Sequence, residues 1–174
     1  MGIDTSHATI YMPVSYQMLE EAIAQLNPLK PIHHFLDIGC GKGRALCVAA
    51  HYGILKLTGI DLSKELCAEA KINLEQTRLN LPSINYSIIN NDAFYYIIPA
   101  DVDCIFLFNP FDELIMSGVV KNIMESFKAC PRNITIAYVN PLHKALFIQQ
   151  GFKEIYYSKR MKYMELSVLG LSTF

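Results

Sequence analysis

A glycine-dense turn between an apolar run and a helical pattern constrains this chain more than any other feature. Residues 35–43 read Phe-Leu-Asp-Ile-Gly-Cys-Gly-Lys-Gly, and residues 44–51 continue as Arg-Ala-Leu-Cys-Val-Ala-Ala-His. This order predicts a buried strand, a tight loop and the start of a helix. Glycines let the backbone approach a ligand more closely than a residue with a Cβ would allow. Asp37 precedes the loop, and its carboxylate suits a ligand with a cationic or hydroxyl-bearing part better than a bare pyrophosphate.

Strands and helices alternate along the chain five times before two strands follow each other. The patterns predict helices over 15–26, 44–51, 63–79 and 113–129, and strands over 34–38, 57–61, 84–89, 102–108, 133–139, 154–159 and 163–171. A further short helix is predicted from Asn140, as N-cap, and Pro141 to Gly151. Alternation predicts an α/β fold with a mostly parallel sheet between two helical layers. The closing pair of strands is expected to be antiparallel because a short turn joins it.

Composition limits the classes to which the chain can belong. The 174 residues fit one domain, and 52% hydrophobic against 18% charged residues predicts a sizeable core. The net charge of −1 argues against a nucleic-acid partner held by bulk electrostatics, although a local patch can still present one. No signal peptide or membrane span is expected. The five cysteines form no C-x-x-C pair, so we expect reduced thiols, mostly buried, and a cytoplasmic location.

The glycine loop does not match the two common phosphate-binding motifs. A dinucleotide fingerprint requires glycine where Arg44 stands, and a Walker loop requires Ser or Thr where Gly43 stands. Asp61 ends the next predicted strand, about 20 residues beyond the loop, where an acid can hydrogen-bond ribose hydroxyls. Its alternative role is to cap the following helix. His33 and His34 have no matching ligand partners, so no metal site is expected.

Two further polar segments follow the third and fourth predicted strands. Asn91-Asp92-Ala93 follows the third strand and is typical of an Asx turn, and Asp92 can also contact a ligand. Asn109-Pro110-Phe111 lies at the carboxyl end of the fourth strand, the edge at which ligands bind in an open α/β sheet. The alternative is that Asn109-Pro110 only begins the next helix.

Taken together, these segments resemble the class I S-adenosylmethionine-dependent methyltransferases over nearly the whole chain. The G-x-G-x-G spacing with Asp37 two residues before it is similar to motif I of that superfamily. The resemblance implies a Rossmann-like seven-stranded sheet of order 3-2-1-4-5-7-6, with strand 7 antiparallel, and S-adenosyl-L-methionine as cofactor. It also implies a single domain over residues 1–174 in which residues 1–30 form a helical lid. The cofactor-binding residues that it implies are Tyr16, Asp37, Gly39, Cys40, Gly41, Gly43, Asp61, Leu62, Asn91, Asp92, Ala93 and Asn109.

The same resemblance suggests an acceptor chemistry. Asn109-Pro110-Phe111 is similar to the Asn-Pro-Pro-aromatic motif of methyltransferases that act on amine or amide nitrogen, with one proline missing. In that motif the Asn and a backbone carbonyl accept hydrogen bonds from the acceptor nitrogen, and the aromatic residue stacks on the target. These three residues are therefore the expected catalytic residues, and no general base is evident. Tyr11 or Tyr16 is expected to touch the methionine end of the cofactor.

Other interpretations stay open at this point. An inactive S-adenosylmethionine-binding module would keep the glycine loop and lose the chemistry after the fourth strand. An NAD-dependent oxidoreductase is disfavoured by Arg44 and Asp37. Lys42 and Arg44 either pair with an anionic ligand group or are solvated. The acceptor on protein, nucleic acid or a small molecule is not identified, and a homodimer or a partner protein can contribute to its recognition.

Overall fold

The computed structural model describes residues 14–26, 31–108, 111–161 and 164–173 and confirms the predicted fold class. Seven strands form one sheet of order β3-β2-β1-β4-β5-β7-β6. Strands β1 to β5 pair in parallel, whereas β7 is antiparallel to both β5 and β6. The strands are β1 (Phe35–Ile38), β2 (Lys56–Asp61), β3 (Asn85–Asn90), β4 (Cys104–Phe108), β5 (Ile134–Val139), β6 (Lys153–Met161) and β7 (Met164–Leu171).

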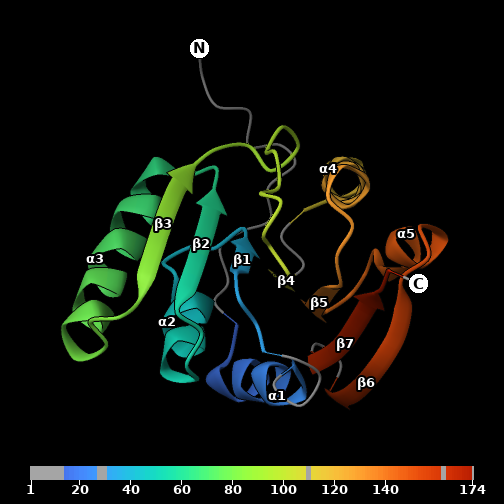
Figure 1. Ribbon diagram of the computed structural model, residues 1–174. Helices are drawn as coiled ribbons and strands as arrows, with labels where there is room; N and C mark the ends of the chain where they lie inside the picture. The colour runs from blue at the N-terminus through green and yellow to red at the C-terminus, as the bar shows by residue number, and fades with distance from the viewer. Residues whose placement is uncertain (1–13, 27–30, 109–110, 162–163, 174) are drawn as a thin grey trace.

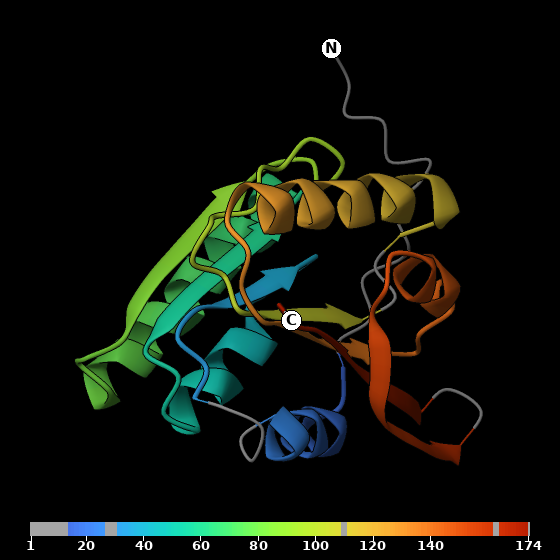
Figure 2. The same ribbon diagram turned by 45° about the vertical axis from the view of Figure 1, so that its right-hand side comes forward.

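Helices cover both faces of this sheet, as Figure 1 shows. They are α1 (Tyr16–Leu26), α2 (Arg44–His51), α3 (Lys64–Asn80), α4 (Glu113–Ala129) and α5 (Lys144–Gln149). One hydrophobic cluster joins α1, α2 and α3 to the sheet, and a second joins α4 and α5 to the other face. Figure 2 shows α4 on the opposite side of the sheet from α2 and α3. None of the described helices is long and apolar enough to cross a membrane.

Local chemistry explains where the two long helices begin. The Ser63 hydroxyl accepts the Leu66 N–H at 3.1 Å and caps α3, as predicted. The Asp112 carboxylate accepts the Ile115 N–H at 3.0 Å and caps α4. The start of α4 therefore has its own cap directly after the Asn-Pro-Phe segment.

The predicted start of the short helix after β5 is wrong. Asn140 is not its N-cap, because α5 begins only at Lys144 and has His143 before it. Asn140 adopts φ 49°, in the left-handed region, and its side-chain Oδ1 accepts the Glu165 N–H at 3.3 Å. Its N–H donates to the Glu165 carbonyl at 2.8 Å. Asn140 thus pairs with β7 and cannot cap a helix at the same time. The predicted helix end is correct, since Gly151 adopts φ 95° directly after Gln150, the C-cap of α5.

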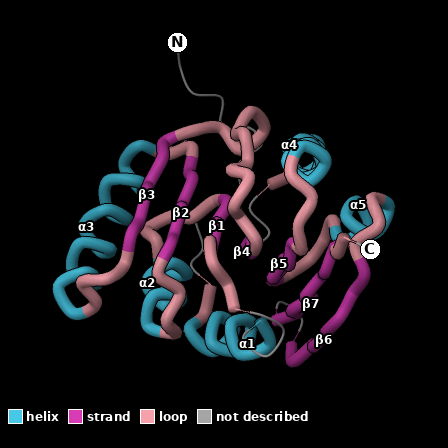
Figure 3. The backbone as a smooth tube through the Cα atoms, viewed as in Figure 1, coloured by secondary structure: helices cyan, strands magenta, loops and turns pink. Residues whose placement is uncertain are grey.

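The connection between β3 and β4 contains no helix, so the alternation is interrupted once. Figure 3 draws residues 91–103 as loop throughout. Ala93, Tyr96 and Ile98 of this loop are buried and join the hydrophobic cluster of α4 and α5. Tyr95 and Ile97 point the other way and are 74% and 86% exposed. An extended segment therefore covers the part of the sheet that a helix would otherwise cover.

Candidate functional site

The glycine loop turns back onto the end of β2. Gly39, Gly41 and Gly43 have φ values of 81°, 53° and 76°, which residues with a Cβ rarely adopt. The N–H groups of Gly39 and Cys40 both donate to the Ile60 carbonyl at 2.9 Å, and the Gly43 N–H donates to the Cys40 carbonyl at 2.8 Å. These three N–H groups therefore donate to carbonyls of the protein itself and are not available to a ligand. The glycines contribute the tight turn and the absence of side chains, and the Cys40 thiol is buried in the core.

Asp61 lies directly beside this loop. One carboxylate oxygen accepts the Gly41 N–H at 2.8 Å and the other accepts the Ser63 N–H at 2.9 Å. Because Ser63 caps α3, Asp61 is not the N-cap of that helix. Each carboxylate oxygen has a further lone pair, and Asp61 is partly exposed. The backbone therefore fixes the orientation of a carboxylate that can still accept hydrogen bonds from a ligand.

Asp37 is a buried carboxylate at the centre of the sheet. It pairs in register with Gly59 of β2 and Phe106 of β4 and is only 4% exposed. No described residue donates a hydrogen bond to it or forms an ion pair with it. Burial first, and the negative charge of Asp61 second, raise the pKa of Asp37 from 3.8 to about 8. A cationic ligand group at this position would offset both effects, so the site fits the positively charged cofactor that was predicted.

The segment after β3 has the predicted Asx turn. The Asp92 carboxylate accepts the Phe94 N–H at 2.8 Å, and the Asn91 side chain accepts the Asp92 N–H at 2.8 Å. The Asn91 N–H donates to the Asp61 carbonyl at 3.1 Å and joins this segment to the end of β2. Ala93 is buried. The other carboxylate oxygen of Asp92 has no hydrogen bond within the described residues, so the turn and a ligand contact are compatible.

Only part of the expected catalytic segment is described. Asn109 and Pro110 lie outside the described residues, as does Tyr11. Phe108 and Phe111, on either side of the pair, are half-buried against the two hydrophobic clusters. Phe108 ends β4, next to β1, so the end of β4 lies at the same sheet edge as the glycine loop and Asp61.

Arg44 has a role that the sequence did not reveal. Its guanidinium donates to the Val14 carbonyl at 2.9 Å and lies 4.7 Å from the centre of the Tyr16 ring. Lys42 forms an ion pair with Glu69 at 2.7 Å. Arg44 therefore ties the start of α1 to the glycine loop, whereas Tyr16 itself remains 59% exposed. Only the unusual position of an arginine at the start of α2 hints at this role.

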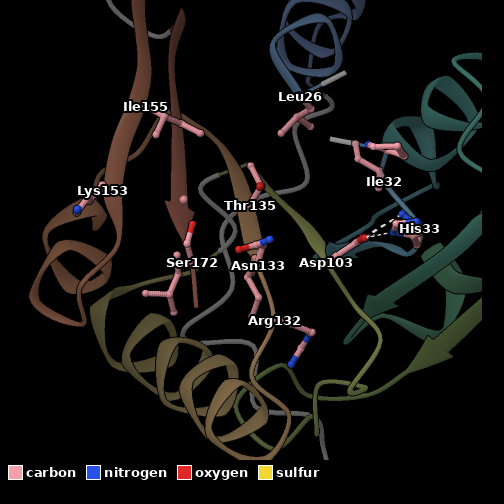
Figure 4. Close-up of a pocket in the computed structure, with 14 residues that line it drawn as sticks. Leu26, Ile32, His33, Asp103, Arg132, Asn133, Thr135, Lys153, Ile155 and Ser172 are labelled. Carbon is pink, nitrogen blue, oxygen red and sulfur yellow. Dashed lines mark hydrogen bonds and ion pairs between the residues drawn. The ribbon is translucent and has the colours of Figure 1, made fainter. Parts of the chain in front are cut away.

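A separate cavity of about 510 Å³ lies at the opposite edge of the sheet, before the starts of β1, β4 and β5 (Figure 4). Arg132 at this cavity donates to four backbone carbonyls and to the Ser126 hydroxyl. Asp103 accepts the backbone N–H groups of His33 and His34 and the His33 ring at 2.8 Å. These charged groups hold the starts of the strands in place. They lie at the opposite end of the strands from the glycine loop.

Comparison with solved structures supports the fold. An S-adenosylmethionine-dependent methyltransferase from Aquifex aeolicus is 14% identical, with a TM-score of 0.66 and coverage of 91% of this chain and 93% of that one. Magnesium protoporphyrin IX methyltransferase from Synechocystis, solved with S-adenosylmethionine bound, is 14% identical, with a TM-score of 0.63 and coverage of 92% and 85%. A methyltransferase from Thiobacillus denitrificans in complex with S-adenosylhomocysteine is 22% identical, with a TM-score of 0.62 and coverage of 86% and 68%.

The sequence comparisons identify the family. A search of curated protein sequences gave no match. The model of the methyltransferase domain family matches residues 35–130, which is more than half of the chain and runs from β1 through α4. The matched range contains the glycine loop, Asp61 and the segments after β3 and β4. This chain therefore belongs to the methyltransferase domain family.

Proposed function

We propose that this chain transfers a methyl group from S-adenosyl-L-methionine to an amine or amide nitrogen. The observation that carries the proposal is the pair of carboxylates, Asp37 and Asp61, that flanks the glycine loop. Membership of the methyltransferase family and structural neighbours solved with S-adenosylmethionine or its demethylated product support the predicted cofactor. The family match gives no support to the alternative that the chain is an NAD-dependent oxidoreductase.

Each segment of the site has a part in holding the cofactor. Asp37 meets its cationic amino-acid end, directly or through water, Asp61 accepts hydrogen bonds from ribose hydroxyls, and Asp92 meets the adenine amino group. When bound, the cofactor supplies an electrophilic methyl group on a sulfonium. The chain then has to orient the acceptor nitrogen in line with that methyl and exclude water, and positioning of this kind lowers the barrier by several kcal/mol.

The proposed acceptor contact is Asn109, with Pro110 and Phe111. Because Asp112 caps α4, Asn109 is not needed to start that helix. Its side chain and a backbone carbonyl would accept hydrogen bonds from the acceptor nitrogen and direct the nitrogen lone pair at the methyl. Phe111 would stack on a planar group. The acceptor is carried by a protein, a nucleic acid or a small molecule, and a second copy or a partner protein can help to hold it.

The N-terminal segment is proposed to close the cofactor site as part of the same single domain. The described part of residues 1–30 begins at Val14, where the Arg44 contact holds it next to the glycine loop. Free cysteines, three of which are buried, suit a reducing compartment, and we place the enzyme in the cytoplasm.

The first test is ligand binding followed by label transfer. S-adenosylhomocysteine at 100 times its dissociation constant should add about 2.7 kcal/mol of stability, and thus raise the melting temperature by about 5–10 °C. Methyl-labelled cofactor in a fractionated lysate should then label protein, RNA or the small-molecule pool. Binding without any transfer would favour the alternative, an inactive cofactor-binding module, and no binding would contradict the proposal.

The second test separates the cofactor contact from the acceptor contact. Asp61→Ala should weaken S-adenosylhomocysteine binding by about tenfold to a hundredfold, because it removes the ribose acceptor and releases Gly41. Asn109→Ala should leave binding within about twofold and lower turnover by about tenfold to a hundredfold. Glu125→Ala, an exposed acid on α4, is the control. Full turnover in Asn109→Ala would reduce the Asn-Pro-Phe segment to a structural role.

A further inference from the structure

Three segments of the proposed cofactor site each receive a hydrogen bond from an asparagine side chain. In every case the amide Nδ2 donates to a backbone carbonyl of the segment, and each asparagine belongs to a different element. The pairs are Asn73 of α3 with the Lys42 carbonyl at 2.9 Å, Asn90 of β3 with the Leu62 carbonyl at 2.7 Å and the Asp61 carbonyl at 3.1 Å, and Asn122 of α4 with the Phe94 carbonyl at 2.9 Å and the Ala93 carbonyl at 3.4 Å.

These contacts hold the segments without occupying the groups that would face a ligand. A carbonyl oxygen is an acceptor only, and an asparagine amide supplies two N–H donors. The Asp61 carboxylate accepts the N–H groups of Gly41 and Ser63, the Asp92 carboxylate accepts the Phe94 N–H, and neither is bonded to the three asparagines. The asparagines therefore fix the backbone, and the carboxylates remain available for the ligand.

The three asparagines also differ in how strongly they should act. Asn122 is partly buried, and its segment packs against α4, whereas Asn73 and Asn90 are exposed. A hydrogen bond shielded from water contributes more than one that water can replace. We therefore expect Asn122 to have the largest effect.

We propose that Asn73, Asn90 and Asn122 are positioning residues for S-adenosylmethionine, and that each one serves the part of the cofactor held by its own segment. The proposal rests on the function proposed above. Asn73 orients the glycine loop toward the amino-acid end, Asn90 orients the ribose segment, and Asn122 orients the adenine segment.

The test measures the binding of two ligand probes to the full chain by calorimetric titration. S-adenosylhomocysteine has both the nucleoside and the amino-acid end, and adenosine has the nucleoside alone. Asn90→Ala should weaken both probes by about threefold, and Asn122→Ala should weaken both by about tenfold. Asn73→Ala should weaken S-adenosylhomocysteine by about threefold and leave adenosine unchanged, since adenosine lacks the amino-acid end. A general loss of stability would not produce this split between probes.

Two further variants sharpen the result. Asn122→Asp keeps the shape of the side chain but places an acceptor against the two carbonyls, so it should bind adenosine no better than Asn122→Ala does. Asn85→Ala, an exposed asparagine at the other end of β3 whose side chain has no hydrogen bond among the described residues, should bind both probes like the unmodified chain. If Asn122→Ala does not fold, the exposed Asn73 and Asn90 still provide the test.

The proposal is overturned if all three alanine variants bind S-adenosylhomocysteine within about twofold of the unmodified chain, or if Asn73→Ala weakens both probes equally. The function proposed above would survive either result, because the unmodified chain would still bind. If the unmodified chain does not bind S-adenosylhomocysteine at all, both the proposed function and the positioning role of the asparagines are overturned.

Discussion

Asp37 is the residue whose chemistry depends most on the fold. Burial and the neighbouring Asp61 raise its pKa from 3.8 to about 8, so at pH 7 the carboxyl of the unligated folded chain holds a proton that the unfolded chain has lost. A group with a raised folded-state pKa stabilises the fold fully below its unfolded pKa. The contribution of Asp37 to the free energy of unfolding is therefore lost as the pH rises from about 4 through about 8.

The corresponding prediction concerns Asp37→Asn. The free energy of unfolding of the unmodified chain should fall relative to that of Asp37→Asn by up to about 1.4 kcal/mol per pH unit between pH 5 and 8, because asparagine has no proton to lose. Urea unfolding at four pH values measures both curves. Parallel curves over this range would show that Asp37 ionises normally.

Single residues also show which parts of the site could be predicted from the sequence. Asp61 and Asp92 follow strands at short, fixed distances, so their positions at the sheet edge follow from the parallel order of the strands. The partners of Arg44 and Asn140 are 30 and 25 residues away. No local pattern carries such contacts, and the pattern of Asn140-Pro141 was that of a helix start.

At the scale of elements, α4 supports the loop that replaces a helix between β3 and β4. A Cβ at Gly118 of α4 would lie 2.4 Å from the nearest atom of the Phe94 ring. Four residues further along the same helix, Asn122 donates to the Phe94 carbonyl. The absence of a side chain at position 118 therefore lets the segment after β3 pack directly on the helix.

Gly118→Ala tests this packing. Alanine should favour the helix by about 1 kcal/mol, but the clash has to move Phe94, so we expect no net gain in stability and weaker adenosine binding by about fivefold. The double variant Gly118→Ala with Phe94→Ala should recover part of the binding lost in the single Gly118→Ala variant. If Gly118→Ala is more stable and binds adenosine normally, the ring moves without cost and the loop does not depend on this contact.

The strands around the site and the two long helices could be predicted because their signals are local, whereas the order of the strands in the sheet was implied by the family resemblance. The apolar runs of β1 and β4 and the caps and breakers around α3 fix these elements within a few residues. The loop between β3 and β4 is different, because only residues 95–98 alternate between exposed and buried and the packing of Phe94 on Gly118 is a tertiary contact.

On the scale of the whole molecule, the two edges of the sheet have separate roles. The carboxyl edge carries the glycine loop, Asp61 and the segments after β3 and β4. The amino edge carries the Arg132 contacts, the Asp103 contacts and a buried His34, whose ring lies 2.8 Å from the Thr58 hydroxyl. The parallel strands connect the edges, so the amino edge can hold the strand starts without touching the proposed ligand.

Arg132→Ala tests the separation of the two edges. Arg132 donates to the carbonyls of Pro99, Val102, Ser126 and Cys130, which join the end of the β3–β4 loop to the end of α4. Its removal leaves these acceptors without their partner, so unfolding should become easier by about 2–3 kcal/mol. Affinity for S-adenosylhomocysteine, measured well below the melting temperature, should stay within about twofold, because the carboxyl-edge loops keep all of their own hydrogen bonds. A loss of affinity above about tenfold in a variant that is still folded would mean that the strands transmit a displacement from one edge to the other, and the two edges would then have to be treated as one coupled unit.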